Sequence, residues 1–279
     1  MTGLFDDISF KTSKLITESY STSFASAVSY LHPDIQNAIY SIYGFVRLAD
    51  EIVDTFHEYD KQSLLEKFER DYYEAFRSGI SLNPALNSFQ HTVTKYNIHD
   101  DLIQAFLRSM KIDLVKSDHN SRDETDEYIY GSAEVVGLMC LKVFVNGDET
   151  LYNELKDPAR RLGSAFQKVN FLRDIKNDTQ DLNRKYFHNT VSNGFDEKVK
   201  EEIIDDIIND FDSSIQGLKK LPESSRLGVM IAYLYYRNLL KKIKRTPAGK
   251  LLEKRIRVSD RVKLIILGKA IVVSKFNLL

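Results

Sequence analysis

Apolar residues recur at every third or fourth position along almost the whole chain, which is the period of helices that bury one face. Glycine and proline, the residues that interrupt helices, number only 12 and 5 among 279 residues. We find no alternating strand pattern, internal repeat, low-complexity stretch or linker. Hydrophobic residues make up 43% of the chain, which is enough for a sizeable core. The sequence therefore predicts an all-α fold in a single domain over residues 1–279.

Helix boundaries follow from the few prolines and glycines. Pro33, Pro84 and Pro158 suit the first turn of a helix, while Gly79 and Gly147 suit breaks between helices. The predicted helices cover residues 13–30, 33–54, 60–78, 84–96, 99–117, 124–146, 157–181, 196–219, 222–244 and 247–273.

Cysteine content and the ends of the chain narrow the class of protein. Cys140 is the only cysteine, so a disulfide within the chain and a cysteine-based zinc site are both excluded. A reducing compartment fits this composition best. The N-terminus lacks the basic and apolar regions of a signal peptide, and no apolar run reaches the ~18 residues of a membrane span. We therefore expect a cytoplasmic protein.

Charge is unevenly distributed, although the net charge is only −1. The segment from Arg237 to Leu279 holds 13 Lys and Arg against 2 acidic residues. Such a basic, amphipathic tail predicts peripheral contact with the anionic inner face of the cytoplasmic membrane. A C-terminal core helix with a solvated basic face explains the pattern equally well, and both can hold together. No basic-aromatic motif supports nucleic-acid binding, and nothing identifies a protein partner.

The helix that follows Pro33 carries an acidic stripe. Asp50 and Asp54 lie four residues apart, so they project from one face, and Arg47 and Tyr43 lie further back along the same stripe. The rest of this helix is mostly apolar and should be buried. Buried charge is costly unless it is paired or bound to a metal. The stripe is therefore predicted to line a cavity rather than the surface.

A second pair of aspartates has the same spacing, so spacing alone does not decide whether such a pair lines a cavity or lies on the surface. Asp206 and Asp210 lie opposite an apolar stripe that includes Ile203, Ile207 and Phe211, and no Arg or Tyr shares their face. We predict that this pair lies on the solvated surface.

The predicted helix 157–181 carries another polar stripe. Gln167, Asn170, Asp174 and Asp178 follow one another at intervals of three, four and four, and Arg173 lies beside them. Taken alone, this face could equally be solvated surface. If it faces the first acidic helix, however, the four aspartates form a site for a hard divalent cation, with Mg²⁺ expected and Mn²⁺ as an alternative. Arginines nearby could hold phosphate groups, so the implied chemistry is metal-assisted departure of diphosphate.

With these motifs the chain resembles the squalene/phytoene synthase family over nearly its whole length. The resemblance also rests on three further segments, a Ser-x-Ser-Phe near the N-terminus, Tyr128–Gly131 with Val135–Gly137, and an Arg-x-Tyr after the second acidic motif. Glu134 stands where the family commonly has glycine, and Arg184 comes one residue later than is usual. The matching segments are residues 21–24, 43–54, 128–137, 159–178 and 184–187.

The resemblance implies a helical bundle around a deep cavity, with the two aspartate motifs facing each other at its mouth. The implied metal ligands, which are also catalytic, are Asp50, Asp54, Asp174 and Asp178. Tyr128 and Arg173 complete the implied catalytic set. The implied substrate-binding residues are Ser21, Phe24, Tyr43, Arg47, Gln167, Asn170, Arg184 and Tyr235. For Tyr128 and Tyr235, core packing with a satisfied hydroxyl remains an equal alternative.

The resemblance also implies the reaction, a head-to-head condensation of two prenyl diphosphates through a cyclopropylcarbinyl diphosphate. Reductive members of the family are usually longer and carry a membrane anchor, so we expect no nicotinamide cofactor. Two geranylgeranyl diphosphates giving phytoene is the first expectation. Squalene or dehydrosqualene made from farnesyl diphosphate is the alternative. A non-catalytic assembly factor and a class I terpene cyclase are alternatives of other kinds, but the intact aspartates disfavour the first and the form of the acidic motifs disfavours the second.

Overall fold

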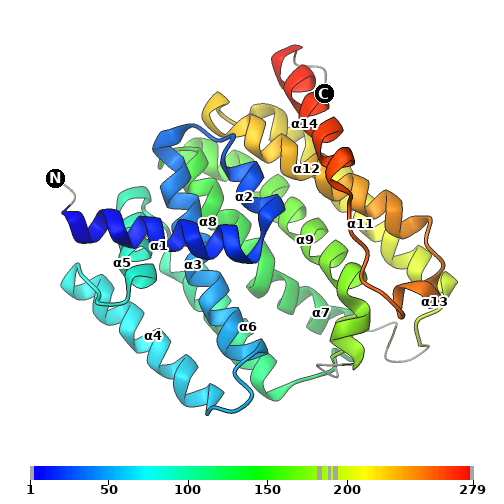
Figure 1. Ribbon diagram of the computed structural model, residues 1–279, viewed down its shortest axis with the longest axis horizontal. Coiled ribbons are helices and arrows are strands. Elements are labelled where there is room, and N and C mark those ends of the chain that lie inside the picture. The colour runs from blue at the N-terminus through cyan, green and yellow to red at the C-terminus, as the bar shows by residue number, and fades with distance from the viewer. Residues whose placement is uncertain (1–2, 181–183, 188–189, 191–193, 277–279) are drawn as a thin grey trace.

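The computed structural model describes residues 3–180, 184–187, 190 and 194–276. Within these residues every regular element is a helix, which confirms the all-α class (Figure 1). The elements are α1 (Leu4–Tyr20), α2 (Thr22–Val28), α3 (Pro33–Asp54), α4 (Lys61–Ser78), α5 (Pro84–Tyr96), α6 (Asp100–Val115), α7 (Arg122–Ile129), the π-helix η1 (Tyr130–Glu134), α8 (Val135–Phe144), α9 (Glu149–Gln180), α11 (Glu197–Lys220), α12 (Glu223–Lys244), α13 (Ala248–Leu251) and α14 (Asp260–Phe276).

Helix α3 lies at the centre of the N-terminal part of the bundle. It packs against α1, α2, α4, α5, α6 and α8. Phe45 on its inner face is fully buried and stacks on Phe89 with ring centroids 4.0 Å apart, while Phe68 and Phe106 close around it. Aromatic packing of this kind fixes α3 against its neighbours. The side of α3 that bears the acidic stripe is thereby turned toward the opposite half of the molecule.

The predicted single helix over 13–30 is wrong, because the chain forms two helices that meet at Ser21. Ser21 has φ −145° and ψ 85°, which is not helical, and its N–H still bonds to the carbonyl of Thr17 at 2.9 Å. The turn lets α2 leave the direction of α1. Residues of α2 consequently reach the central cavity, which a straight continuation would not allow.

The predicted helix 124–146 is interrupted by the π-turn η1. A side chain at Gly131 would bring its Cβ within 2.9 Å of the Ala105 carbonyl, and one at Gly163 would come equally close to the Ala133 carbonyl. Helices α6 and α9 therefore press against η1 from two sides at glycine contacts. Single π-turns inside helices often occur at functional sites, and this one lies beside the cavity.

The helix predicted to begin at Asp157 and Pro158 begins instead at Glu149, and Pro158 lies inside it. A proline inside a helix removes one backbone hydrogen bond, so a proline after an N-cap residue ordinarily indicates the start of a helix. In this protein that indication is misleading. A Cβ at Gly217 would lie 2.3 Å from the Cβ of Pro158, so α11 packs against the proline ring itself. The predicted last residue of this helix, 181, lies outside the described residues.

The predicted C-terminal helix 247–273 divides into α13 and α14, separated by an irregular segment from 252 to 259. Ile256 and Val258 are buried, whereas Arg255 and Arg257, which alternate with them, are exposed. This alternation is typical of an extended chain with one side against the protein. No helix within the described ranges is both long enough and apolar enough to cross a membrane.

The prediction that Asp206 and Asp210 form a surface pair is wrong for Asp210. Asp210 is buried, and its Oδ2 accepts hydrogen bonds of 2.7 Å from both Lys168 and Ser164 on α9. Arg161 donates to its other oxygen at 3.2 Å, and Lys168 also binds Asp206. A buried carboxylate needs such partners. They come from another helix, which the local pattern around Asp210 could not reveal.

Candidate active site

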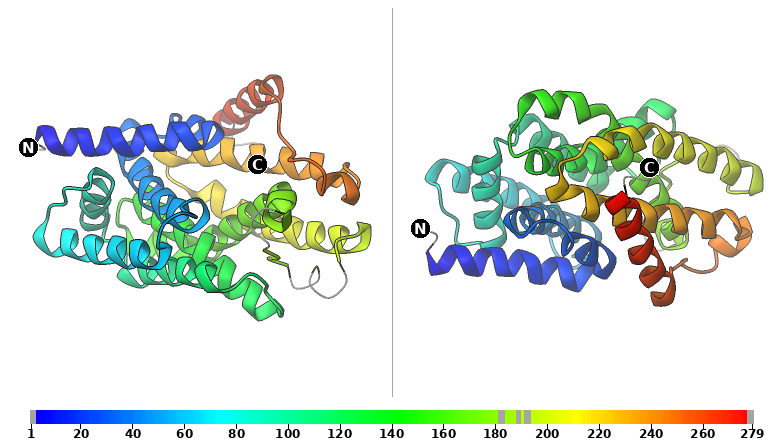
Figure 2. Two further views of the ribbon diagram at one scale, coloured as in Figure 1. Left: turned by 60° about the horizontal axis from the view of Figure 1, so that its bottom comes forward. Right: turned by 90° about the horizontal axis from the view of Figure 1, so that it is seen from above.

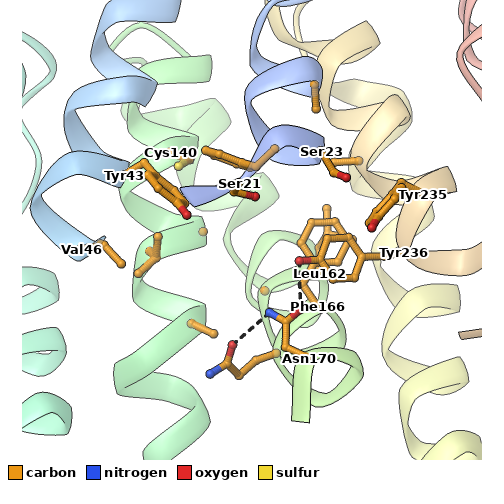
Figure 3. A pocket seen from close by; sticks show the side chains of 18 of the residues that line it. Ser21, Ser23, Tyr43, Val46, Cys140, Leu162, Phe166, Asn170, Tyr235 and Tyr236 are labelled. Carbon is orange, nitrogen blue, oxygen red and sulfur yellow. Dashed lines mark hydrogen bonds between the residues drawn. The ribbon is translucent and has the colours of Figure 1, made fainter. Parts of the chain in front are cut away.

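A cavity of about 830 Å³ runs between α2, α3, α8, α9, α11 and α12, and Figure 3 shows part of its wall. Every residue that the sequence analysis assigned to the site lines this cavity. They are Ser21, Phe24, Tyr43, Arg47, Asp50, Asp54, Tyr128, Gln167, Asn170, Arg173, Asp174, Asp178, Arg184 and Tyr235.

The acidic end of the cavity combines the two aspartate pairs. Asp50 and Asp54 come from the last turns of α3, and Asp174 and Asp178 come from the C-terminal part of α9. Burial, followed by the charge of Asp54, raises the pKa of Asp50 to about 8. Burial, followed by the charges of Asp174 and Asp54, raises the pKa of Asp178 to about 7. Because Asp54 affects carboxylates on both helices, the two pairs lie within electrostatic reach of each other.

Arginines bind this acidic end from three places. Nη1 of Arg184 donates a hydrogen bond of 2.7 Å to Asp54, and Nε of Arg173 donates one of 3.0 Å to its neighbour Asp174. Arg255, from the irregular segment before α14, forms an ion pair with Asp174 in which Nε lies 2.6 Å from Oδ1. These cations offset part of the negative charge.

Arg47 is placed differently from the other predicted phosphate ligands. Its guanidinium is paired with Glu51 on the same helix and lies 4.3 Å from the ring centroid of Tyr20. Its Nε is buried without a hydrogen-bond partner. The side chain still lines the cavity, so this donor remains free on the cavity side of α3.

The four aspartates do not form a closed metal cage. Among the residues that the structure describes, no three acidic, histidine or cysteine side chains gather closely enough to hold an ion by themselves. The carboxylates are nevertheless close enough for their charges to raise one another's pKa values, in addition to the effect of burial, and such a cluster of like charge is suited to a cation. Mg²⁺ keeps several waters and is typically bound through one or two carboxylates together with substrate phosphates. The arrangement suits that mode of binding.

A fifth carboxylate, Asp113 of α6, also faces the acidic end and was not predicted. Its Oδ2 accepts a hydrogen bond of 2.6 Å from the hydroxyl of Tyr128, and burial raises its pKa to about 7. Tyr186, another unpredicted residue of the cavity wall, stacks on Tyr128 with ring centroids 5.2 Å apart. Tyr128 thus lines the cavity with its ring buried and its hydroxyl bonded, so both the site role and the alternative of core packing with a satisfied hydroxyl agree with its position.

The middle of the cavity is polar, as Figure 3 shows. Nδ2 of Asn170 lies 3.5 Å from Oε1 of Gln167, one turn earlier on α9. Oδ1 of Asn170 accepts a hydrogen bond of 3.1 Å from the hydroxyl of Tyr236 on α12. Ser21 and Tyr43 face the same space from the opposite side. Burial raises the pKa of Tyr43 to about 12, so its hydroxyl stays protonated and can donate a hydrogen bond.

Beyond this polar belt the walls are apolar. Phe24 stacks on Tyr43 at 5.0 Å, and Phe166 stacks on Tyr236 at 4.1 Å. Further lining comes from Val28, Ile39, Cys140, Leu141, Phe144, Leu155, Leu218 and Leu221.

Glu134, which departs from the family pattern, does not line the cavity. Its carboxylate accepts a hydrogen bond of 2.7 Å from Nε of Arg160 on α9, and the Arg160 guanidinium lies over the ring of Tyr130. The acidic residue therefore joins η1 to α9 on the outer side of the π-turn and leaves the cavity wall unchanged.

The residues that the sequence reasoning missed share one property. Asp113, Tyr186, Tyr236 and Arg255 each reach the site from an element without a polar stripe of its own. Arg255 in particular lies within what was predicted to be continuous helix. Two signals were available: the Arg-x-Tyr segment, which contains Tyr186, and the alternation of Arg255 and Arg257 with Ile256 and Val258, which indicates extended chain.

Comparison with known proteins places this site in a family. A family model described as squalene/phytoene synthase matches residues 17–262. A 4,4'-diapophytoene synthase from Staphylococcus haemolyticus is 25% identical over 82% of this chain and 85% of its own length. A chloroplastic phytoene synthase from an Oncidium hybrid cultivar is 27% identical over 82% of this chain, which spans 59% of that longer protein.

Solved structures agree on the fold. A dehydrosqualene synthase crystallised with a ligand superposes with a TM-score of 0.83 at 22% identity, covering 97% of this chain and 98% of that one. A squalene synthase from Alicyclobacillus acidocaldarius gives 0.74 at 18% identity, covering 88% and 96%. The family match extends over most of the chain and includes both aspartate motifs, so the chain belongs to the squalene/phytoene synthase family.

Proposed function

We propose that this protein is a prenyltransferase that joins two geranylgeranyl diphosphates head to head and yields phytoene, a carotenoid precursor. The observation that carries the proposal is the single cavity with aspartates and arginines at one end and apolar walls at the other. Such a cavity matches substrates that have an anionic diphosphate on a long hydrocarbon chain. The relatives named as phytoene and 4,4'-diapophytoene synthases support the same class of reaction.

At the acidic end, Asp50, Asp54, Asp174 and Asp178 would hold Mg²⁺, or Mn²⁺ in its place. The bound metal ions would supply positive charge that stabilises diphosphate as a leaving group. Arg173, Arg184 and Arg255 can bind phosphate oxygens through charge-assisted hydrogen bonds. Each of these arginines is already paired with an aspartate. Entry of metal and diphosphate would therefore exchange ion pairs within the protein for contacts with the substrate.

The rest of the cavity would guide the carbon chemistry. When diphosphate leaves the first substrate, the double bond of the second attacks the allylic carbon, and loss of a proton from the resulting cation closes the ring of a cyclopropylcarbinyl diphosphate. That intermediate then ionises, rearranges and loses a proton, so no reductant and no nicotinamide cofactor are needed. Phe24, Tyr43 and Phe171 line the cavity, where aromatic rings would stabilise positive charge. The apolar walls beyond them exclude water that would quench the cations.

The length of the cavity supports the longer substrate. Asp178 and Leu155 both line it and lie 23 residues apart on α9, a span of about 34 Å along the helix. Ala27 and Ala159 in the apolar part of the wall carry small side chains, which leave room for a long chain. Farnesyl diphosphate, giving squalene or dehydrosqualene, would leave more of this wall unused, and for this reason we rank it second.

The test is an incubation of the purified protein with Mg²⁺ and either geranylgeranyl or farnesyl diphosphate, scored by released diphosphate and by the extracted hydrocarbon. We expect a forty-carbon product that is lost in Asp174→Asn. A thirty-carbon product would overturn the substrate choice and keep the reaction. No turnover with either substrate, in a folded protein, would point instead to a non-catalytic relative.

The proposed product is a long hydrocarbon that partitions into a bilayer rather than water. We infer a cytoplasmic protein that works at the membrane surface, with cations near its C-terminus attracted to anionic lipid.

A further inference from the structure

Helix α14 exposes an apolar stripe on its outer side. Leu264 and Ile265 are 71% and 70% exposed, and Ile271 and Val272 continue the stripe two turns later. These positions recur at helical spacing and thus share one face. The opposite face, with Ile266 and Ala270 buried, packs against α12. The exposed apolar side chains are therefore not a consequence of fraying but the outer face of a packed helix.

Cations border this stripe. Arg261 and Lys269 are both exposed on α14, and Asp260 at the first position is the only acidic residue of the helix. An amphipathic helix that combines an exposed apolar face with flanking Lys and Arg is the type that lies in the interface of an anionic bilayer.

Helix α1 is also apolar on its outer side, in an inverted arrangement. Its fully buried residues are Ser9, Ser13 and Thr17, whereas Leu4 and Leu15 are 77% and 63% exposed. The inner face requires small residues, because a Cβ on the neighbouring α3 at Gly44 would lie 2.8 Å from the hydroxyl of Ser13. A helix of a soluble protein ordinarily turns its apolar side inward.

The two helices lie on one face of the molecule. In both views of Figure 2, α1 and α14 run along the same edge, the upper edge on the left and the lower edge on the right. Both reach the cavity: Tyr20, the last residue of α1, and Lys263, in the first turn of α14, line it. The face thus frames a region from which the cavity is reached.

We propose that this face, formed by the outer sides of α1 and α14, is the surface that docks on an anionic lipid bilayer, with α14 as the anchor. Two separate apolar stripes on one face suit a fluid occupant, because lipid needs no matched shape. The cations of α14 match anionic headgroups. The exposed charges of α1 are balanced, with Asp7 and Glu18 against Lys11 and Lys14, so α1 adds apolar contact without a net attraction of charge. The proposal rests on the proposed function for its purpose, since substrate and product both carry long hydrocarbon chains.

Binding to vesicles tests the docking face without any substrate. We expect the full chain to sediment with vesicles rich in phosphatidylglycerol and to bind pure phosphatidylcholine vesicles at least about tenfold more weakly. The double variant Leu264→Glu/Ile265→Glu should bind the anionic vesicles at least about tenfold more weakly than the parent, because the introduced carboxylates would have to enter the apolar part of the bilayer. Val115→Glu is the matched control, since Val115 is 83% exposed at the end of α6, and should bind like the parent.

Other outcomes are equally informative. The proposal fails if the parent does not bind anionic vesicles, or if Val115→Glu weakens vesicle binding as much as the α14 double variant does. A parent that is dimeric in solution and a double variant that is monomeric, with no vesicle binding by either, would make the face an interface between two copies. Turnover of detergent-dispersed substrate separates the two proposals: turnover without vesicle binding refutes only the docking face, and vesicle binding without turnover refutes only the proposed function.

Discussion

The hydroxyl of Tyr128 donates a hydrogen bond of 2.6 Å to Oδ2 of Asp113 at the acidic end of the cavity. The other carboxylate oxygen, Oδ1, is buried and has no hydrogen-bond partner. Buried polar atoms without partners are uncommon, and one that lines a cavity is available to a ligand. Asp113 and Tyr128 therefore act as a unit in which the carboxylate fixes the orientation of the phenol.

This unit gives the first prediction. Asp113→Asn and Tyr128→Phe should each lower kcat by at least about tenfold, because each removes a charged or hydroxyl group that is held at the reacting end. The double variant should be little worse than either single variant, since residues that act as a unit are not additive. Steady-state kinetics of the parent, the two single variants and the double variant together form a double-mutant cycle. Asp101→Asn, exposed on the same helix as Asp113, is the control and should keep full activity; additive losses would show that the two residues act separately.

The second prediction concerns pH and stability without metal. The pKa values of Asp50, Asp113 and Asp178, about 8, 7 and 7, lie above those of the unfolded chain because of burial. The native state therefore binds more protons than the unfolded state, and stability must fall as the pH rises from about 4 toward 8. In EDTA, we expect Tm to be lower at about pH 9 than at about pH 6 by roughly 5 °C or more.

Two variants check the cause of that fall. Asp50→Asn removes one of the titrating carboxyls. The Tm of this variant should therefore fall less between the two pH values than the Tm of the parent, and at the higher pH it should be above that of the parent. The variant should also be inactive, because the carboxylate is a proposed metal ligand. Asp7→Asn, exposed on α1, should behave as the parent does. A parent whose Tm rises with pH over this range would contradict the assignment.

The third prediction concerns Arg255, which is paired with Asp174 but is 45% exposed in its side chain. Because so exposed an ion pair adds little to stability, Arg255→Ala should leave Tm within about 2 °C of the parent. It should weaken the binding of inorganic diphosphate with Mg²⁺ at least about fivefold, since a phosphate ligand is lost. Calorimetric titration gives the affinity. Lys254→Ala is the control, because Lys254 directly precedes Arg255 and does not line the cavity. Equal losses of diphosphate affinity in both variants would show that the effect comes from general surface charge.

Much of the architecture could be predicted from periodicity. Helices α3, α4, α5, α11 and α12 begin and end within one residue of their predicted bounds, because caps and apolar stripes are local signals. The errors occur where tertiary contacts decide. Pro158 is a sound local start signal, but contact with Gly217 keeps it inside α9.

The candidate site follows the same division. Asp50, Asp54, Asp174 and Asp178 could be predicted to share a cavity because each pair forms a stripe on its own helix, and all four do line it. Asp113 and Arg255 could not, since each is brought to the site by the packing of its segment and not by a polar stripe of its own. The same cause misplaced Asp210, whose partners lie on α9.

Asp210 carries the fourth prediction, which concerns stability alone. Lys168 is its main partner, and both side chains are less than 10% exposed. Removing Lys168 leaves the buried Asp210 carboxylate with only the largely exposed Arg161 as a cation, so Lys168→Met should lower the free energy of unfolding by about 3 kcal/mol. Adding Asp210→Leu should recover part of this loss, because the poorly compensated carboxylate disappears. The chain offers a matched control on the same two helices, the exposed pair Lys220–Glu154, for which Lys220→Met should cost less than about 1 kcal/mol. Urea denaturation of the four proteins measures all of these changes, and equal costs for the two lysines would show that burial of the Lys168 pair has no energetic consequence.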